Sequence, residues 1–319
     1  MVEIDVTEVG PECRERATAE LEQMFRDSED LKIIVTKDFD VKVTEYLRTV
    51  GVFEPYESKR YGGEVVACKT MNYPLEGRLG TCLVANANAP MFSNWEDPYA
   101  KMERAFHLAH EKKHVSLNTT RYLSVGHDRF YSHPKTASEC MEVLADDIAS
   151  EYLAERSAIA LLQDMTKKDL GLQDGAVVSY LFDLYNGLID ILNRHFGALQ
   201  TFLQDSVEEY RSRKITIEVF WPKIYLRTRD AFNALALVTA FEDTKPSISG
   251  VKSASNNSTV TGCFKDIWDR VTTCLWLLWD NEAGYNDGLV DIASAFQDLF
   301  LWFGVKLSDG PQGMRLDLN

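Results

Sequence analysis

The sequence predicts an α+β protein, with a small mixed N-terminal half followed by a mostly α-helical C-terminal half. Short β-branched runs alternate with helical patterns up to residue 87, which is typical of a small sheet packed against helices. Helical periodicity dominates from residue 99 onward. A change of character near Asp164 divides the 319 residues into two expected domains, 1–165 and 166–319.

Local patterns define the elements expected before residue 88. Apolar residues recur with helical spacing over 10–27 and 41–50, so a helix is predicted in each range. Runs rich in β-branched residues and bounded by turn residues predict strands at 31–36, 63–69 and 80–87.

Two long helices are expected around a loop in the middle of the chain. Residues 88–97 predict a loop that leads into a helix over 99–116. Residues 118–137 show no clear period and predict a long ordered loop, which is uncommon unless it serves a nearby site. A second helix is expected over 138–165, with Ser138 as its N-cap.

The second half is predicted to be a series of helices joined by polar segments. Helical patterns occur at 174–195, 197–213, 223–241, 263–280 and 287–304. Residues 215–220 form a β-rich run that Pro222 follows. The Ser/Thr/Asn/Gly-rich segment 244–262 predicts a flexible loop, and the tail from Ser308 is expected to be loose.

Charge and composition limit the expected partners. The formal net charge of -15 at pH 7 argues against direct binding of nucleic acid or anionic membranes. No apolar run approaches the ~18 residues of a membrane helix, and the start M-V-E-I-D-V-T-E lacks the apolar segment of a secretory signal. The cysteines form no C-x-x-C pair, as expected of reduced thiols. We therefore expect a cytoplasmic protein without a membrane partner.

The pattern His110-Glu111-x-x-His114 indicates the most specific chemistry in the chain. On a helix, residues four apart lie about 40° apart around the axis and roughly 6 Å along it, so both imidazoles face the same way. Such a pair can hold Zn²⁺, and Glu111 can take a proton from a water molecule on the metal. His107 is expected to support the ligands or to pack beside them.

A catalytic zinc ion normally needs a third protein ligand. Glu142 is the candidate, because it lies 28 residues after His114 (142 minus 114) on the next expected helix. Asp146, one turn further on, is placed to accept a hydrogen bond from a zinc-bound histidine. Glu139 and Asp147 are weaker alternatives to Glu142 on the same helix.

The expected loop between these helices holds groups suited to stabilising an oxyanion. His127, Tyr131 and His133 each carry a hydrogen-bond donor, and Tyr131 is the favoured catalytic residue. The alternative is an ordinary loop without a catalytic role.

Two segments resemble a known family. Phe106-His-Leu-Ala-His-Glu-Lys-Lys-His114 is similar to the R-F-T-L-A-H-E-L-G-H signature of the ImmA/IrrE-type metallopeptidases. Glu142-Val-Leu-Ala-Asp-Asp-Ile-Ala149 resembles their E-x-x-A-N/D-x-F-A segment. The match covers residues 15–160. It implies a zincin-like metallopeptidase domain with Zn²⁺ on His110, His114 and Glu142, and with Glu111 as the general base.

The resemblance also implies a kind of substrate. Members of this family are regulatory proteases that cut DNA-binding transcriptional repressors in stress responses, and a basic repressor would suit this acidic chain. The strand ending at Ala87 would be the edge along which an extended peptide lies. The chain departs from the family where Lys112 and Lys113 replace Leu-Gly and where His107 replaces Thr.

The sequence thus predicts a cytoplasmic zinc-dependent endopeptidase that acts on a protein or peptide substrate. The alternative is an inactive metallopeptidase-like scaffold that serves as a protein-binding module, which the pair Lys112-Lys113 favours. A third hypothesis is a purely structural helical protein with an accidental motif. For the helical second half, the sequence suggests only a general role, as a sensor, partner-binding or cover domain.

Overall fold

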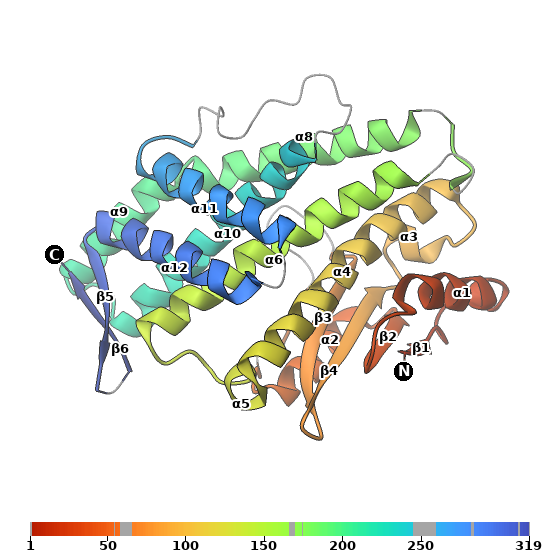
Figure 1. Cartoon of the computed structure of the whole chain (residues 1–319), viewed down its shortest axis with the longest axis horizontal. Coiled ribbons are helices and arrows are strands. Elements are labelled where there is room, and N and C mark those ends of the chain that lie inside the picture. The colour runs from red at the N-terminus through yellow and green to blue at the C-terminus, as the bar shows by residue number, and fades with distance from the viewer. Residues whose placement is uncertain are drawn as a thin grey trace. The chain divides into compact units, whose positions relative to one another are not determined.

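Contacts within the chain define two compact units. The computed structural model describes residues 2–53, 55–57, 66–165, 170–173, 175–244, 260–281, 284–311 and 313–318. One unit contains Met1–Ser132 and Ser157–Val177, and the other contains His133–Arg156 and Val178–Asn319. The long helix α6 (Ala137–Asp164) contributes to both units (Figure 1). This division differs from the single boundary expected at residue 165.

The first unit is built on a four-stranded sheet with the order β1-β2-β4-β3. Its strands are β1 (Val2–Asp5), β2 (Leu31–Thr36), β3 (Cys68–Leu75) and β4 (Arg78–Asn86). Strands β1, β2 and β4 run parallel, whereas β3 is antiparallel to β4 and lies at the edge. The expected strands at 31–36 and 80–87 are therefore confirmed, and β1 was not predicted.

Strand β3 begins later than the strand expected at 63–69. Residues 63–65 lie outside the described ranges, and β3 continues through Pro74, where the sequence predicted a linker. An edge strand tolerates proline because the missing N–H group faces away from the sheet. The turn before β4 is confined to Glu76 and Gly77, which both have positive φ angles.

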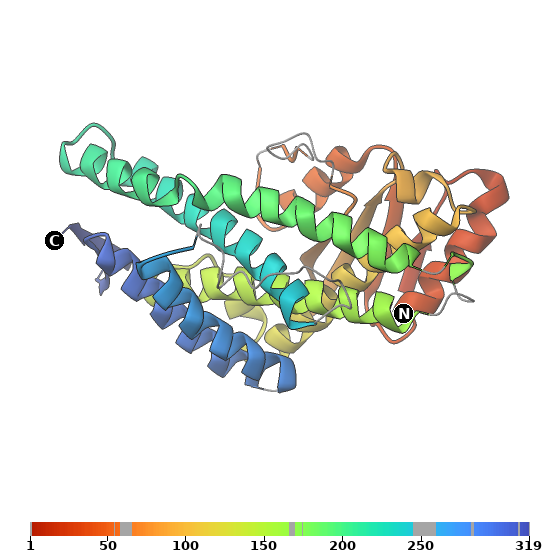
Figure 2. The ribbon, with the colours of Figure 1, turned by 90° about the horizontal axis from the view of Figure 1, so that it is seen from above.

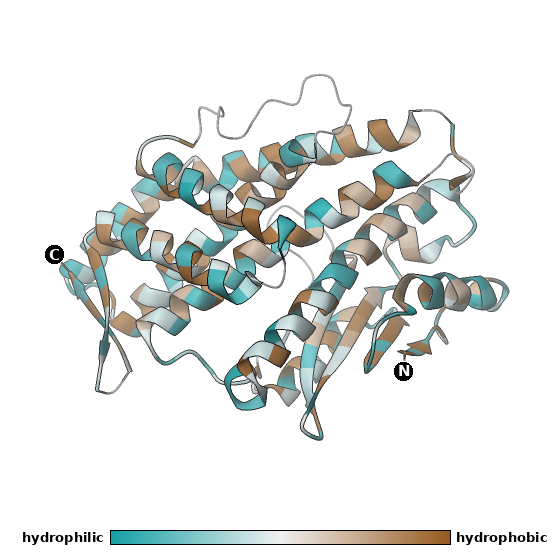
Figure 3. Ribbon diagram, viewed as in Figure 1, coloured by the Kyte–Doolittle hydropathy of each residue, from teal (hydrophilic) through white to brown (hydrophobic). Residues whose placement is uncertain are grey.

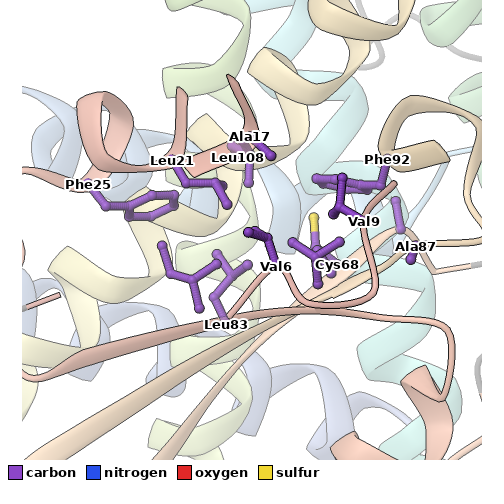
Figure 4. Packing of buried hydrophobic residues seen from close by; sticks show 14 of the residues in the cluster. Val6, Val9, Ala17, Leu21, Phe25, Cys68, Leu83, Ala87, Phe92 and Leu108 are labelled. Atoms are coloured by element: carbon purple, nitrogen blue, oxygen red, sulfur yellow. The ribbon is translucent and has the colours of Figure 1, made fainter. Parts of the chain in front are cut away.

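Helices cover both faces of this sheet. Residues alternate between the faces along a strand, so Ile33 and Leu83 face one side while Ile34 and Val84 face the other. The first side packs against α1 (Arg14–Phe25) and α4 (Pro98–Val125), and Figure 4 shows the apolar side chains that fill this core. The second side packs against α2 (Phe39–Thr49). Both predicted helices of the first 50 residues are confirmed.

Helix α4 carries the His-x-x-x-His pattern and is longer than predicted. It follows the short helix α3 (Pro90–Ser93), and the carboxylate of Asp97 caps its first turn by accepting the N–H groups of Tyr99 and Ala100. The loop expected at 118–137 is wrong in its first part, because α4 continues to Val125 and α5 (His127–Phe130) follows. The Tyr122 hydroxyl donates to the carbonyl of Gly77, a contact with the β3–β4 turn that no local pattern contains.

A buried arginine fixes α4 against the rest of its unit. The Arg104 side chain is fully buried and forms an ion pair with Glu20 of α1 at 3.0 Å. Its guanidinium group also donates to the carbonyls of Met91 and Asn94, and it stacks on the Trp95 ring at 4.3 Å from the ring centroid. A buried charge is stable only when it is paired and hydrogen-bonded. This network therefore positions the start of the helix that carries the histidines.

The second unit is mainly helical. Besides part of α6 it contains α8 (Ala176–Phe196), α9 (Leu199–Arg211), α10 (Ile217–Asp243), α11 (Cys263–Asp280) and α12 (Tyr285–Trp302). Apolar and polar stretches alternate along α8 and α11 (Figure 3), and α11 and α12 pack side by side (Figure 2). The ring of Phe232 contacts the rings of Phe196, Phe264, Trp268 and Phe296, so four helices meet at one aromatic core.

Two predictions for this unit are wrong. Residues 217–220 of the β-rich run are helical, and α10 contains Pro222 in its interior. The tail is not loose but forms a hairpin of β5 (Val305–Gly310) and β6 (Gly313–Leu318). The expected helices at 138–165, 174–195, 197–213, 263–280 and 287–304 are confirmed within a few residues at each end. Residues 245–259 of the expected flexible loop lie outside the described ranges. No helix in the described ranges combines the length and apolar composition needed to cross a membrane.

Candidate metal centre

Helix α4 brings the two predicted histidine ligands together. The Nε2 atoms of His110 and His114 lie 3.1 Å apart, and their ring centroids lie 4.8 Å apart. Two nitrogens that each lie ~2.0–2.1 Å from a tetrahedral zinc ion are separated by about 3.3 Å. The pair therefore has the spacing that a shared Zn²⁺ ion requires.

The third ligand of the metal site was predicted to lie on α6. His110 and His114 belong to the first unit, whereas the part of α6 that carries Glu142 belongs to the second. Glu151 belongs to α6. Two imidazoles and one carboxylate are a donor set used by catalytic zinc sites, so the predicted residue types fit this metal.

Glu142 has a hydrogen-bond partner on its own helix. Its carboxylate accepts a hydrogen bond from the Ser138 hydroxyl at 3.4 Å. Among the alternatives on α6, Glu139 accepts the main-chain N–H groups of Lys135 and Thr136 and so caps the helix. Glu142 as the third ligand stays a prediction, with Glu151 as its competitor.

Glu151 shares a sequence pattern with Glu142. The Glu-x-x-Ala spacing seen at Glu142 and Ala145 recurs at Glu151 and Ala154. Both glutamates lie on the same helix, so helical periodicity alone does not choose between them. Only the approach of other elements to α6 can make that choice.

Asp146, the predicted partner of a zinc histidine, has a partner in its own unit. The Tyr285 hydroxyl at the start of α12 donates to Asp146 Oδ1 at 2.9 Å. Tyr285 is 1% exposed, so this hydrogen bond is shielded from water. The predicted supporting role of Asp146 at the metal stays a prediction.

The predicted general base is held by the edge strand. The carboxylate of Glu111 accepts the main-chain N–H of Thr70 in β3 at 2.8 Å. The Thr70 hydroxyl lies 3.5 Å from the Glu111 carbonyl oxygen as a donor to it. Because Thr70 directs its N–H away from β4, the carboxylate of Glu111 lies at the open edge of the sheet.

His107 packs beside the pair as a neutral imidazole. Burial, and to a smaller extent the neighbouring His110, lower the pKa of His107 to about 4. Its ring meets Phe106 edge to face, with centroids 5.5 Å apart. A neutral ring offers one N–H donor and one acceptor, which suits a residue that supports a ligand.

Tyr131 lies in an aromatic cluster near the end of α4. Its ring packs against Tyr122, His127 and Phe130 with centroid distances of 6.5, 5.1 and 5.1 Å. Its hydroxyl is buried without a hydrogen-bond partner in the described ranges, and burial raises its pKa to about 12. Tyr122 follows His114 by eight positions, or about 12 Å along the helix. The oxyanion role of Tyr131 stays a prediction.

One edge of the sheet is formed by β3, and the strand that ends near Ala87 is not an edge strand. Strand β4 pairs with β2 on one side and with β3 on the other, so it has no open edge. The prediction from the family resemblance is wrong on this point. The open edge next to α4 belongs to β3, whose residue Thr70 contacts Glu111.

Comparison with protein-family models, with curated proteins and with solved structures finds no match for this chain.

Proposed function

We propose that this protein is a zinc-dependent endopeptidase. The proposal is carried by one observation, the distance of 3.1 Å between the Nε2 atoms of His110 and His114 on the helix that also carries Glu111. The resemblance of the segment around His110 to the ImmA/IrrE-type metallopeptidases supports the same activity. Zinc would be the cofactor because the donor set combines imidazole and carboxylate groups.

The residues around the pair suit hydrolysis of a peptide bond. Zinc, when bound, lowers the pKa of a water molecule and polarises a carbonyl group. Glu111 would take a proton from the attacking water and pass it to the leaving amine. The N–H of Thr70 holds the Glu111 carboxylate at 2.8 Å, so the base is oriented before a substrate arrives.

An extended peptide would lie along β3. Residues two apart in a strand direct their main-chain groups to the same side, so Cys68 and Asn72 present theirs outward like Thr70. Pro74 has no N–H to offer, which limits peptide pairing toward the turn. We infer that the substrate pairs with the segment between Cys68 and Asn72 beside Glu111.

The net charge favours a basic substrate. A chain with a formal charge of -15 attracts cationic partners over long distances and repels nucleic acid. A DNA-binding transcriptional repressor would carry the opposite charge. We therefore propose a regulatory protease that acts in the cytoplasm on such a protein in a stress response.

The test compares wild-type protein with Glu111→Gln in the presence of zinc. Cleavage would be read by mass spectrometry on a proteome-derived peptide library, and bound zinc by elemental analysis. We expect both proteins to bind zinc and only the wild type to cut, because the glutamine cannot accept a proton. Equal cleavage by both proteins would refute this mechanism.

A second candidate function is a metallopeptidase-like scaffold without catalysis. Lys112 and Lys113 lie between the histidines in the sequence and are both partly buried, so each adds a positive charge to the helix that carries the pair. Such charge opposes the binding of a cation. Wild-type protein that binds stoichiometric zinc but cuts no library peptide and no co-expressed repressor would favour this candidate.

A further inference from the structure

Two hydrogen bonds connect α4 to the hairpin of β3 and β4, and they lie far apart along the helix. The first joins the Glu111 carboxylate to the main-chain N–H of Thr70 at 2.8 Å. The second joins the Tyr122 hydroxyl to the carbonyl of Gly77 in the turn of the hairpin, also at 2.8 Å. All four residues belong to the first unit, and Figure 1 shows α4 running beside the two strands. The hairpin is therefore attached to α4 at two points.

Glu111 and Tyr122 lie on the same face of α4. They are 11 residues apart (122 minus 111), which is about 16.5 Å along the helix axis and about 20° around it. On the hairpin, Thr70 and Gly77 are separated by the second half of β3 and the turn. The strand and the helix therefore run alongside each other between the two contacts. A single contact would leave β3 free to pivot about it, whereas two contacts fix its position along α4.

Strand β3 needs a second contact because it lies at the edge of the sheet. It pairs with β4 on one side, and among the described residues no strand pairs with its other side. Its turn consists of Glu76 and Gly77, which both have positive φ angles, and a Cβ atom at Gly77 would meet nothing within 4 Å. The turn therefore faces open space at Gly77, and the Tyr122 hydroxyl ties it to the helix.

Neighbouring side chains fix the direction of the Tyr122 hydroxyl. The hydroxyl has a single proton, which its bond to Gly77 uses, so the Nδ1 atom of His127 at 3.2 Å must donate to the hydroxyl oxygen. The rings of His127 and Phe130 meet the Tyr122 ring edge to face, with centroids 6.0 and 5.5 Å away. The donor that reaches Gly77 is thus held from two sides.

We propose that Tyr122 is a positioning residue for the general base Glu111 and acts through the hairpin of β3 and β4. With the turn tied to Tyr122, β3 holds the N–H of Thr70 where it orients the Glu111 carboxylate. Without this tie the edge strand shifts along α4, and the carboxylate loses its fixed direction. Misplacement of a catalytic group by ~1 Å can cost on the order of 10²-fold in rate. The effect of Tyr122 on turnover rests on the proposed peptidase function.

The test compares full-length wild type with Tyr122→Phe, which removes only the hydroxyl. We expect the amide proton resonance of Thr70 to shift in the same direction as in Glu111→Gln. Hydrogen exchange at this amide should rise roughly tenfold, because its hydrogen bond opens more often. The amide of Ile33 in β2 should be unchanged, since β2 lies between β1 and β4 in the sheet. A variant that is merely less stable would exchange faster in both strands.

Zinc content and turnover are measured on the same proteins. Tyr122→Phe should bind as much zinc as wild type, while its kcat for a library peptide that wild type cuts falls on the order of tenfold. Arg78→Gln is the matched control, because it breaks an exposed ion pair with Asp30 beside the same turn and leaves α4 untouched. This control should keep both the wild-type kcat and the wild-type resonance of Thr70.

The two readouts separate the positioning role from the peptidase function. A wild-type kcat in Tyr122→Phe would overturn the positioning role, whether or not the resonance of Thr70 shifts. An unchanged resonance and unchanged exchange of Thr70 would overturn it as well. A shifted Thr70 resonance in Tyr122→Phe, with no cleavage by wild type, would support the tie between the hairpin and α4 and would refute the peptidase function.

Discussion

Glu142 and Glu151 lie on opposite sides of α6. They are nine residues apart on this helix, which at 100° per residue places them about 180° apart around its axis. The two carboxylates therefore cannot reach one metal ion from the same straight helix. At most one of Glu142 and Glu151 can therefore be the third ligand.

Single substitutions at these glutamates decide between them. We expect one of the two variants Glu142→Gln and Glu151→Gln to lose zinc affinity as His110→Ala does, and by more than the ~10–100-fold typical of residues that only support a ligand. The other variant should retain wild-type affinity and is the matched control on the same helix. The measurement is zinc competition with a chromophoric chelator. Loss of affinity in Glu142→Gln alone would confirm the original prediction, and wild-type affinity in both variants would contradict a ligand at either position.

His107 makes stability depend on pH when no metal is present. Its pKa is lowered to about 4 in the folded protein, below the ordinary value near 6.5. The unfolded chain therefore binds the proton more readily. The stability from the neutral ring is complete above pH 6.5 and is lost as the pH falls from 6.5 toward 4.

The urea midpoint at pH 7 and pH 5, measured with a chelator, tests this dependence. Wild type should lose more stability over this interval than His107→Gln, which has no ionisable ring. His133→Gln is the control, since His133 is an exposed histidine of the same chain. Equal losses of stability in wild type and His107→Gln would show that another group causes the loss at low pH.

The C-terminal hairpin fixes the start of α6 within the second unit. Asp309 of β5 accepts the N–H of Ala137 at 2.6 Å, and the N–H of Met314 in β6 donates to the carbonyl of Lys135 at 2.7 Å. Asp309, which lies 172 positions after Ala137 in the sequence, thus caps the first turn of α6. Gly313 has a φ angle of +116°, and a Cβ atom there would lie 2.9 Å from the Lys135 carbonyl oxygen.

Gly313→Ala should therefore destabilise the second unit more than a substitution that adds backbone strain alone. Gly262→Ala is the control, because its φ angle is +60° and a Cβ atom there has no neighbour within 4 Å. Strain at such positions costs ~1–3 kcal/mol, and Gly313→Ala adds the loss of the hairpin contact. Hydrogen exchange over residues 133–140 should rise only in Gly313→Ala. Equal exchange in both variants would argue against the anchoring role.

The elements that the sequence predicted well are those with strong local patterns. Residues 31–36 and 263–280 form the expected strand and helix because their own apolar periodicity matches the face that they bury. The end of α4 was missed because its support comes from Gly77, 45 positions from Tyr122. The start of α10 has a β-branched pattern, yet Phe220 stacks on Tyr210 at 4.6 Å and is buried in a helix. Tertiary packing outweighs local propensity in such segments.

Some residues of the candidate site also follow from local patterns, whereas others depend on contacts between elements. The histidine pair and Glu111 follow from spacing within a single helix, where i and i+4 positions converge. The third ligand comes from another helix, on which two Glu-x-x-Ala segments compete. The contact of Glu111 with Thr70 joins residues 41 positions apart. No pattern within one element carries that information, because it depends on how the sheet edge meets α4.

The net charge of the whole molecule predicts how fast a charged substrate associates with it. With 49 acidic and 34 basic side chains, the chain surrounds itself with a negative potential that extends about one Debye length, ~8 Å at physiological salt. Long-range attraction of this kind accelerates the encounter of opposite charges and is weakened by salt.

A basic peptide should therefore associate with the protein more slowly as the ionic strength rises. Between about 0.02 and 0.5 M salt we expect the association rate to fall on the order of tenfold, while the dissociation rate changes little. Stopped-flow fluorescence with one labelled peptide measures both rates, and a neutral peptide of the same length is the control. A local basic surface that dominates recognition would give the opposite outcome, with acidic peptides favoured at low salt. The sign of the salt dependence thus separates a cationic substrate from an anionic one before the substrate itself is known.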